Sequence, residues 1–485
     1  MTAPQKQKNR RQTIIDTLFF TLALSTLAAV TSRPPLVADP DIWLHLLTGK
    51  LIAANRAVPY IDTFSAHAAG RPWIAYSWLF DVLVHAVYSV SGYRGLLALT
   101  TCVATATTGL TALFLSRFMN LRRALILAFL EYLVLVPLKS PRPWLFTILF
   151  FTIELFLLWI ARERGRPAWL LPIVPLFVLW ANLHIQFVYG LGLIGLFALD
   201  ASVPASIRAK ISAEPSPALR GRWFWVLLTA SCMSTLLNPY GWKLYTMVVE
   251  YATQAAPLAY IEEFQAMPFR SIWNWLAILL IGSAVFVLGR SKSLVLISSL
   301  AAGCFFGFRS QRDIWFPVAV SLLALASEMR KGSPEFARSR CIYAIAIPLS
   351  LLISVSTLTV GDEFSEQALS KGIAEHFPVQ ASTFIESQHL QSPFFNSYHW
   401  GDYLIFRFPK ITVSIDGRTD LSNDYLPRAV NTLTGKGNWS LDPDLKKART
   451  IILERDGALA SILRVDSRYR LIYEDNTASV FEPVR

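Results

Sequence analysis

Long apolar runs separated by short polar connectors dominate the chain up to about residue 360. A bilayer core about 30 Å thick needs roughly 20 apolar residues per helix, or somewhat fewer for short spans. We therefore predict an α-helical polytopic membrane protein with about eleven transmembrane helices. Their expected positions are 13–32, 93–116, 124–138, 144–161, 168–182, 187–200, 223–237, 272–289, 293–308, 313–327 and 341–360.

The first long interruption of this pattern runs from Asp39 to Trp78 and mixes acids and histidines with tryptophans and leucines. Within it, residues 41–55 place apolar side chains near helical spacing, which predicts an amphipathic helix at the membrane interface. Residues 76–90 form a second apolar piece that is short for a crossing. We assign 33–92 to a first extracytoplasmic loop that carries these interfacial helices.

After residue 360 the chain becomes polar, and short alternating runs predict strands. The candidates are KITVSID (410–416), TIILE (450–454) and a hairpin over 469–484 that turns at Asp475-Asn476. We predict two domains: a multi-pass module over 1–360, and a small α/β or α+β domain over 361–485.

Composition and charge place these parts relative to a membrane. The chain is 53% hydrophobic and 16% charged, against about 25% charged in ordinary soluble domains. Its net charge of +12 is spread over short connectors between the spans. If successive spans cross the membrane in alternating directions, the basic connectors all fall on the cytoplasmic side, so membrane topology explains the charge better than nucleic-acid binding. We expect a bacterial inner-membrane protein with a cytoplasmic N-terminus and a periplasmic or extracellular tail.

Candidate chemistry collects on the predicted outer face. Arg142, Arg309 and Arg312 lie there against the positive-inside tendency, and guanidinium groups match the oxygens of a phosphate. Asn182 and His184 stand at the mouth of a span, where polar groups are functional candidates. The other polar residues expected on this face are Asp39, Asp41, His45, Asp62, Asn238, Glu262 and Glu263.

Structural explanations compete with each of these assignments. Asp39-Pro40-Asp41 also reads as a helix start. His45 and Arg142 could be interfacial anchors, and Glu262-Glu263 could be a solvated acidic step. The acids of HWGDY (399–403) and IDGRTD (415–420) stand beside glycine, as at strand ends and turns, and we expect them to be structural.

The order of these parts resembles the GT-C superfamily of membrane glycosyltransferases, which includes the lipid A aminoarabinose transferases and protein O-mannosyltransferases. There an acidic motif opens the first extracytoplasmic loop and two juxtamembrane helices follow. DPDIWLHLLTGKLI (39–52) would match the motif and the first helix. The chain also resembles a set of bacterial multi-pass proteins that open with D-x-D-x-W-x-H and carry motifs similar to SPRPW, WANLH, LLNPYG, RSQRD and IDGRTD.

The resemblance implies sugar transfer from a polyprenyl-phosphate donor to a lipid, glycan or protein acceptor, in a membrane-lipid environment. Asp41 or Asp39 would be the general base with support from His45, in a cavity shared with the cations. The arginines would bind the phosphate, and Asn182, His184 and Glu262 would contact substrate. Asp39 and Asp41 could hold Mg²⁺ or Mn²⁺, but two carboxylates are few ligands, so we expect transfer without metal.

Two other classes compete with an enzyme. A transporter or flippase of a lipid-linked or anionic substrate would use the prolines and glycines of the middle spans as helix breaks. A non-catalytic scaffold would use the tail to bind envelope partners. The sequence shows no convincing internal repeat, which disfavours the repeat-built transporter folds.

Overall fold

The computed structural model describes residues 3–31, 39–214, 216–329 and 336–484. Residues 33–38, with which the predicted first loop begins, lie outside the described residues. The chain divides into two compact parts. We call the first, Met1–Arg33 with Leu97–Gly241 and Glu263–Gly361, the helical unit; the second, Pro34–Leu96 with Trp242–Glu262 and Asp362–Arg485, is the mixed unit.

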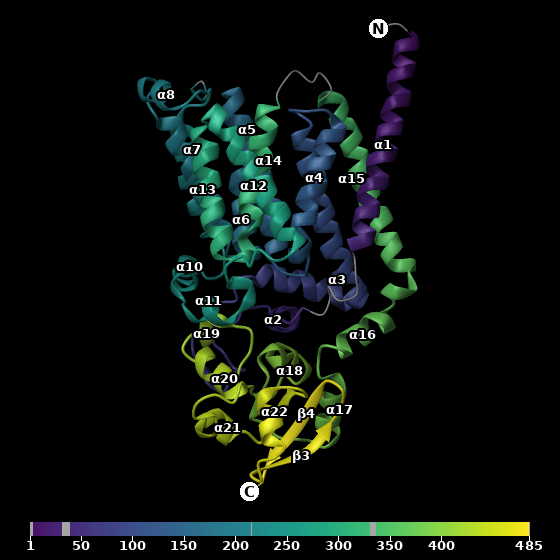
Figure 1. Ribbon diagram of the computed structural model, residues 1–485, viewed down its shortest axis with the longest axis vertical. Coiled ribbons are helices and arrows are strands. Elements are labelled where there is room, and N and C mark those ends of the chain that lie inside the picture. The colour runs from purple at the N-terminus through teal and green to yellow at the C-terminus, as the bar shows by residue number, and fades with distance from the viewer. Residues whose placement is uncertain (1–2, 32–38, 215, 330–335, 485) are drawn as a thin grey trace. The chain divides into compact units, whose positions relative to one another are not determined.

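The helical unit contains the predicted spans, and every one of them coincides with a helix. Several of these helices, α5, α7, α13 and α14 among them, run alongside one another (Figure 1). Their bounds are α1 (Ala3–Thr31), α4 (Leu121–Leu135), η2 (Val136–Leu138), α5 (Trp144–Arg164), η3 (Pro167–Leu170), α6 (Ile173–Leu183), α7 (Phe187–Ser202), α8 (Ala205–Ile211), α9 (Gly221–Ser234), α12 (Ile272–Ser291), α13 (Leu294–Arg309), η5 (Gln311–Asp313), α14 (Trp315–Glu328) and α15 (Phe336–Val360).

Local signals explain where these helices begin and end. Asn120 caps α4 by accepting a hydrogen bond from the Arg123 main chain, and Ser271 opens α12 through a reciprocal capping box with Asn274. Gly165 ends α5 at φ 64°, a left-handed conformation that costs glycine little. The helix positions therefore follow from apolar length and local caps.

The described residues contain four helices that are long and apolar enough to cross a membrane, or five if the bent pair α7 and α8 counts as one span. Shorter apolar helices lie at Pro167–Leu183, Leu294–Arg309 and Ile342–Leu358. The protein is thus a membrane protein built mainly of helices, but the predicted count of about eleven crossings is not confirmed.

Helix α3 (Trp78–Leu115) joins the predicted pieces 76–90 and 93–116. Gly92 interrupts it with φ 56° and ψ −147°, so the backbone turns between two helical stretches. A β-carbon at Gly92 would lie 2.5 Å from a carboxylate oxygen of Glu366. The sequence placed this break correctly.

Helix α2 (Ile42–Asn55) coincides with the helix predicted over 41–55, but it is apolar around most of its circumference and not amphipathic as expected. Its Trp43 is 1% exposed and packs on the rings of Phe377, Tyr403 and Phe406, with centroids 5.1–5.3 Å away. The side of α2 that carries Trp43 therefore packs on protein, where the sequence analysis expected the membrane surface.

The rest of the mixed unit surrounds a four-stranded sheet of order β1-β2-β4-β3, in which β1 and β2 are parallel and the other pairs antiparallel. The strands are β1 (Phe394–Asn396), β2 (Thr450–Glu454), β3 (Tyr469–Glu474) and β4 (Ala478–Pro483). The predicted strand TIILE and the hairpin are confirmed. The helices are α10 (Lys243–Thr253), α11 (Ala256–Tyr260), η6 (Asp362–Phe364), α16 (Glu366–Ala374), α17 (Val379–Ser387), η7 (Tyr398–Trp400), α18 (Gly401–Arg407), α19 (Thr419–Ser422), α20 (Leu426–Leu433), η8 (Trp439–Leu441), α21 (Pro443–Lys447) and α22 (Ala458–Leu463). The short helix η4 (Glu262–Phe264) begins at the last residue of a mixed-unit segment and continues into the helical unit.

The predicted strand KITVSID is wrong. Only Val413 forms bridges, one with Ser65 and one with Phe394. One residue further, the main-chain N–H of Ser414 donates to the side-chain oxygen of Asn396 at 3.0 Å. A side chain thus takes the place of the next ladder carbonyl, and the pairing stops.

Candidate active site

The acidic motif of the first loop has two different carboxylates. Asp39 accepts a hydrogen bond from the main-chain N–H of Asp41 at 3.1 Å, so it holds the turn that precedes α2. Asp41 is the residue before the first helical position, but its side chain makes no capping hydrogen bond. The helix-start explanation therefore applies to the Asp39 side chain.

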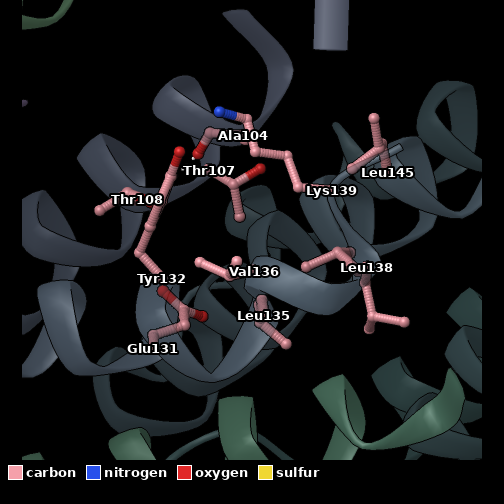
Figure 2. A pocket seen from close by; sticks show the side chains of 11 residues that line it. Ala104, Thr107, Thr108, Glu131, Tyr132, Leu135, Val136, Leu138, Lys139 and Leu145 are labelled. Carbon is pink, nitrogen blue, oxygen red and sulfur yellow. Dashed lines mark hydrogen bonds between the residues drawn. The ribbon is translucent and has the colours of Figure 1, made fainter. Parts of the chain in front are cut away.

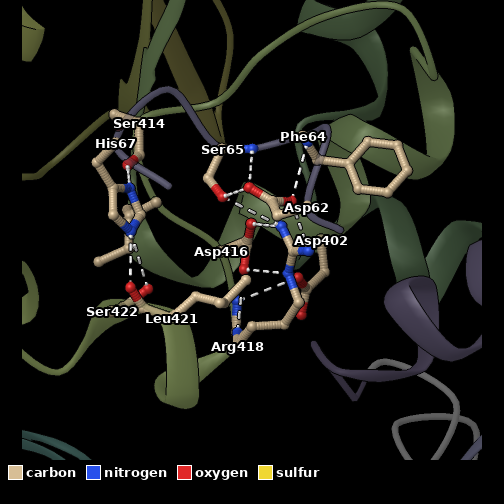
Figure 3. A network of polar contacts seen from close by, with 12 residues as sticks. Asp62, Phe64, Ser65, His67, Asp402, Ser414, Asp416, Arg418, Leu421 and Ser422 are labelled. Atoms are coloured by element: carbon tan, nitrogen blue, oxygen red, sulfur yellow. Dashed lines mark hydrogen bonds and ion pairs between the residues drawn. The ribbon is translucent and has the colours of Figure 1, made fainter. Parts of the chain in front are cut away.

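A buried ion network joins the first loop to the tail within the mixed unit (Figure 3). The guanidinium of Arg418 contacts Asp62 at 2.7 Å and Asp416 at 2.6 Å, and it donates to Ser65 at 3.3 Å. It also lies 4.7 Å from the ring centre of Trp73. One cation thus compensates two buried carboxylates from segments about 350 residues apart.

The network sets the charge of its members. Burial alone would raise the pKa of Asp62, but the charge of Arg418 and hydrogen bonds from Ser65 and Phe64 outweigh burial and lower it. The carboxylates around Arg418 raise the already high pKa of that guanidinium against the opposing effect of burial. Asp62 and Arg418 are therefore charged at neutral pH.

Next to this network, Asp41 and Asp402 both lie close to Gly417. The Gly417 main-chain N–H donates to Asp402 at 3.0 Å. A β-carbon at Gly417 would lie 2.5 Å from one oxygen of Asp402 and 3.4 Å from one of Asp41. Burial first, then the negative charges of Asp416 and Asp41, raise the pKa of Asp402 well above its ordinary value.

This arrangement can perform acid–base chemistry. Neighbouring carboxylates in one buried place do not all ionise, so one of them keeps a proton. Asp402 is 3% exposed, and the direction of its pKa shift makes it the member that protonates most readily. Asp41 is the partly exposed member at the start of α2. A neutral acid beside a carboxylate can donate a hydrogen bond while its neighbour accepts a proton.

The predicted divalent-cation pair fits less well. Asp39 already accepts a main-chain hydrogen bond, and a divalent cation needs about six oxygen ligands. Across the described ranges, no group of three or more His, Cys, Asp or Glu side chains is arranged to hold a metal ion. We therefore assign no step to a metal.

His45 does not extend the acidic pair. Its Nδ1 lies 2.6 Å from a carboxylate oxygen of Asp81, and its ring contacts the edge of Phe80 at 5.0 Å between centres. The residue therefore ties α2 to the start of α3. Its expected support of the base would act through the position of the helix.

In the helical unit, two of the predicted arginines meet at one carboxylate. Arg142 contacts Glu263 at 2.8 Å, and Arg312 contacts the other oxygen of Glu263 at 3.5 Å. Aromatic rings support both guanidinium groups, Trp144 at 4.7 Å and Phe264 at 4.1 Å. This cluster can receive an anion between two oriented forks.

Arg309, the third predicted arginine, ends α13 and is exposed. Nearby, Asp313 is buried and accepts hydrogen bonds from Gln186 at 2.7 Å and from the Tyr189 hydroxyl at 2.8 Å. In the RSQRD segment, Asp313 is thus held in place by buried hydrogen bonds. Arg312 interacts electrostatically with Asp313, while Arg309 is exposed.

The WANLH residues are buried and bonded. His184 Nδ1 lies 2.8 Å from the Thr147 hydroxyl. The amide of Asn182 donates to the main-chain carbonyls of Val178 and Leu237, at 2.7 and 2.9 Å. These contacts fasten helices together, and any substrate contact by either side chain stays a prediction. Glu262 is exposed and directly precedes the arginine-bound Glu263, and its predicted contact with substrate also stays a prediction.

A small cavity of about 30 Å³ lies among α3, α4 and α5 (Figure 2). Its walls are mostly apolar, but Glu131 and Lys139 line it at different ends. The Lys139 ammonium lies 5.6 Å from the ring centre of Tyr132. The volume suits about one water molecule, and we assign it no substrate.

Sequence reasoning missed Asp402, Asp416 and Arg418, which it took for residues of turns and strand ends. A signal for them was present in the motifs HWGDY and IDGRTD, each of which contains an acid. The IDGRTD motif belongs to the same family resemblance as the first-loop motif. The shared cavity for acids and arginines stays a prediction.

The fold is one that known membrane glycosyltransferase structures share: the chain has the fold of solved ArnT and AglB structures. The chain has a set of apolar helices, a first loop that carries an acidic motif, and a small tail that contains a sheet. Sequence comparison alone does not reach this conclusion, because no protein-family model and no curated protein matches the chain.

Solved structures carry the comparison. ArnT from Cupriavidus metallidurans bound to undecaprenyl phosphate has a TM-score of 0.53 and 12% identity, over 96% of this chain and 98% of that one. The archaeal oligosaccharyltransferase AglB from Archaeoglobus fulgidus, in complex with an inhibitory peptide and a dolichol-phosphate, has a TM-score of 0.52 and 11% identity. That match covers 90% of this chain and 69% of AglB.

Proposed function

We propose that the protein transfers a sugar from a polyprenyl-phosphate donor to a lipid, glycan or protein acceptor of the cell envelope. The observation that carries the proposal is the placement of Asp41 and the buried Asp402 close together at Gly417. The GT-C fold supports it, and so do the lipid phosphates bound by ArnT and AglB.

In the proposed reaction the Asp41 carboxylate takes the proton of an acceptor hydroxyl while that oxygen attacks the anomeric carbon of the sugar. The bond between this carbon and the phosphate oxygen breaks, and its electron pair leaves with the polyprenyl phosphate. General-base catalysis of this kind contributes about 10²–10⁴ in rate. Because attack comes from the side opposite to the leaving group, the anomeric configuration inverts.

Neighbouring residues position the base. Asp39 fixes the main chain of Asp41 through its hydrogen bond at 3.1 Å. Asp402 stays neutral and can donate a hydrogen bond, while the charge of Arg418 compensates Asp416. Asp39 and Asp402 are thus positioning residues in this proposal.

The arginine cluster supplies the second element of the mechanism. Arg142 and Arg312 already orient their guanidinium groups toward an anion, the Glu263 carboxylate. A phosphate offers the same acceptor oxygens and gains charge as the glycosidic bond breaks, so oriented cations stabilise it. We assign the donor phosphate to this cluster, with Arg309 as a further cation.

The proposed location follows from charge distribution. Basic connectors on one side favour a cytoplasmic N-terminus. The reaction and the tail over 361–485 would then be on the periplasmic or outer side of a bacterial inner membrane.

The proposal is tested with the purified full-length protein in lipid nanodiscs. Undecaprenyl phosphate linked to glucose, mannose, galactose or aminoarabinose serves as donor, and a bacterial envelope extract serves as the acceptor source. Released undecaprenyl phosphate is quantified by mass spectrometry. We expect Asp41→Asn to lower the rate at least about 100-fold, and Asp39→Asn to lower it less.

Asp466→Asn, at an exposed ion pair of the tail, is the matched control and should keep the rate. Equal elution volumes and melting temperatures show that the variants fold. Full activity in both Asp41→Asn and Asp39→Asn would refute the assignment of the base. Turnover of no donor by the unmodified protein would count against polyprenyl-phosphate donors.

A further inference from the structure

The mixed unit contains a polar cavity whose lining does not include Asp41 or Asp402. It has a volume of about 150 Å³ and is formed by the first loop, the end of α10 and the segment around α19. Leu421, seen in Figure 3 beside the ion network, belongs to its wall. The lining residues are Arg71, Glu250, Thr253, Gln254, Asp420, Leu421, Asn423 and Asp424.

The floor of this cavity holds polar atoms without partners. Gln254 is 5% exposed, and neither atom of its amide group has a hydrogen-bond partner among the described residues. Asp420 is 6% exposed, and one of its carboxylate oxygens also has no hydrogen-bond partner among the described residues. Buried polar groups are nearly always hydrogen-bonded in native proteins. Their partners therefore have to come from whatever occupies the cavity.

The mouth of the cavity sets the sign of that occupant. Glu250 and Asp424 are exposed at the rim and give two carboxylates there, and the buried carboxyl group of Asp420 belongs to the wall. The single cation is Arg71, whose guanidinium donates to the Leu421 carbonyl at 3.2 Å. Carboxylates outnumber cations, so the cavity favours a positive group.

The positive group is better an ammonium than a metal ion. No cluster of three metal-ligating side chains occurs in the part of the chain that the structure describes. An ammonium donates three hydrogen bonds and suits carboxylate and amide oxygens, while the Gln254 amide can donate to a neighbouring hydroxyl. The cavity is smaller than the ~300–1,000 Å³ pockets of drug-sized ligands, so the ligand group is small.

We infer that this cavity binds a small amino-alcohol group, a primary ammonium next to hydroxyls, between the rim carboxylates and Gln254. Such a group occurs on an amino sugar and on an ethanolamine head group. The ammonium binds the carboxylates of Glu250 and Asp420, and the adjacent hydroxyl exchanges hydrogen bonds with Gln254. Because Asp424 and Thr253 leave the rim open, the rest of a larger molecule can extend outward.

The test is isothermal titration of the purified full-length protein in detergent, without any lipid-linked donor, so its result is independent of the proposed sugar transfer. D-Glucosamine is compared with D-glucose, and ethanolamine with ethylene glycol. We expect at least one amine to bind saturably and at least about tenfold more tightly than its neutral match. Which amine binds distinguishes a sugar from a lipid head group.

Two conservative variants locate the site. Glu250→Gln removes one rim charge, and Gln254→Met removes the amide at similar size; we expect each to weaken amine binding at least about fivefold. Glu386→Gln, at an exposed ion pair with Arg407, is the matched control and should bind as the unmodified protein does. Melting temperatures confirm folding.

Three results would overturn the inference: no saturable binding of either amine, which would mean a water-filled cavity; equal binding of the amine and its neutral match; or unchanged affinity in both cavity variants. Loss of sugar transfer in Asp41→Asn, with amine binding intact, would leave the two proposals separate.

Discussion

Replacement of Arg418 by methionine should strongly destabilise the mixed unit. The guanidinium and both of its carboxylate partners are at most 3% exposed. Methionine fills much of the same space but leaves Asp62 and Asp416 buried without their cation. Breaking a buried pair from one side costs about 3–5 kcal/mol, and here two acids lose one partner. We expect a loss near the upper end of that range.

This cost converts to a melting shift that is easy to measure. For a unit of this size 1 kcal/mol shifts the melting temperature by about 2–4 °C, so a shift of at least about 10 °C is expected. Tryptophan fluorescence in detergent is a suitable assay because Trp73 lies 4.7 Å from the guanidinium. Adding Asp62→Asn and Asp416→Asn to Arg418→Met removes the orphaned charges and should restore most of the stability.

The pH dependence gives a second check. Arg418 lowers the pKa of Asp62 below its ordinary value of 3.8, so this stabilisation is present above that value and lost only as pH falls below it. In Arg418→Met, Asp62 becomes protonated at higher pH. The difference in melting temperature between this variant and the unmodified protein should therefore become smaller as the pH is lowered. The control, Arg407→Met at an exposed pair, should cost less than about 1 kcal/mol. An Arg418→Met protein that melts within about 2 °C of the unmodified protein would refute the reasoning.

Three further predictions address the sites. Gly417→Ala puts a β-carbon 2.5 Å from Asp402, and we expect sugar transfer to fall at least about tenfold in the nanodisc assay, with little change in folding by melting temperature; an unchanged rate would contradict the placement. Burial, more than neighbouring charge, raises the pKa of Asp420 to about 7, so ionisation of this acid destabilises the fold as the pH rises from about 4 to 7. Asp420→Asn should therefore raise the melting temperature more at pH 8 than at pH 5, and an equal effect at both values would contradict this. Arg312→Gln should weaken undecaprenyl phosphate binding by native mass spectrometry about tenfold, whereas Arg290→Gln, at the end of α12, should not; equal losses would argue against a specific phosphate cluster.

Much of the helical architecture could be predicted because its causes are local. Each apolar run formed a helix, and Gly92 broke α3 between residues 90 and 93 as expected. Asp39 also behaves as a helix-start residue should. The number of membrane crossings could not be settled in this way, because hydropathy does not distinguish a short span from a helix buried in protein.

The candidate site was only half visible in the sequence. The first-loop acids were recognised because they stand alone in a polar break, but their tail partners looked like turn residues. Arg418 and Asp416 acquire their meaning only when the tail returns to Asp62, about 350 residues earlier. Likewise, the apolar residues of α2 predict a buried helix, but they do not indicate whether lipid or the rings of Phe377 and Tyr403 cover it.

By itself, therefore, the sequence determined the helices, their breaks, the hairpin and the acid that begins the first loop, since helix length, capping and turn formation depend on residues a few positions apart. The tertiary structure alone decided which acids are buried together, which carboxyl group has a raised pKa and where the strand pattern of 410–416 fails. Those outcomes depend on desolvation and on charges that distant segments bring within a few ångströms, and neither is encoded in local spacing.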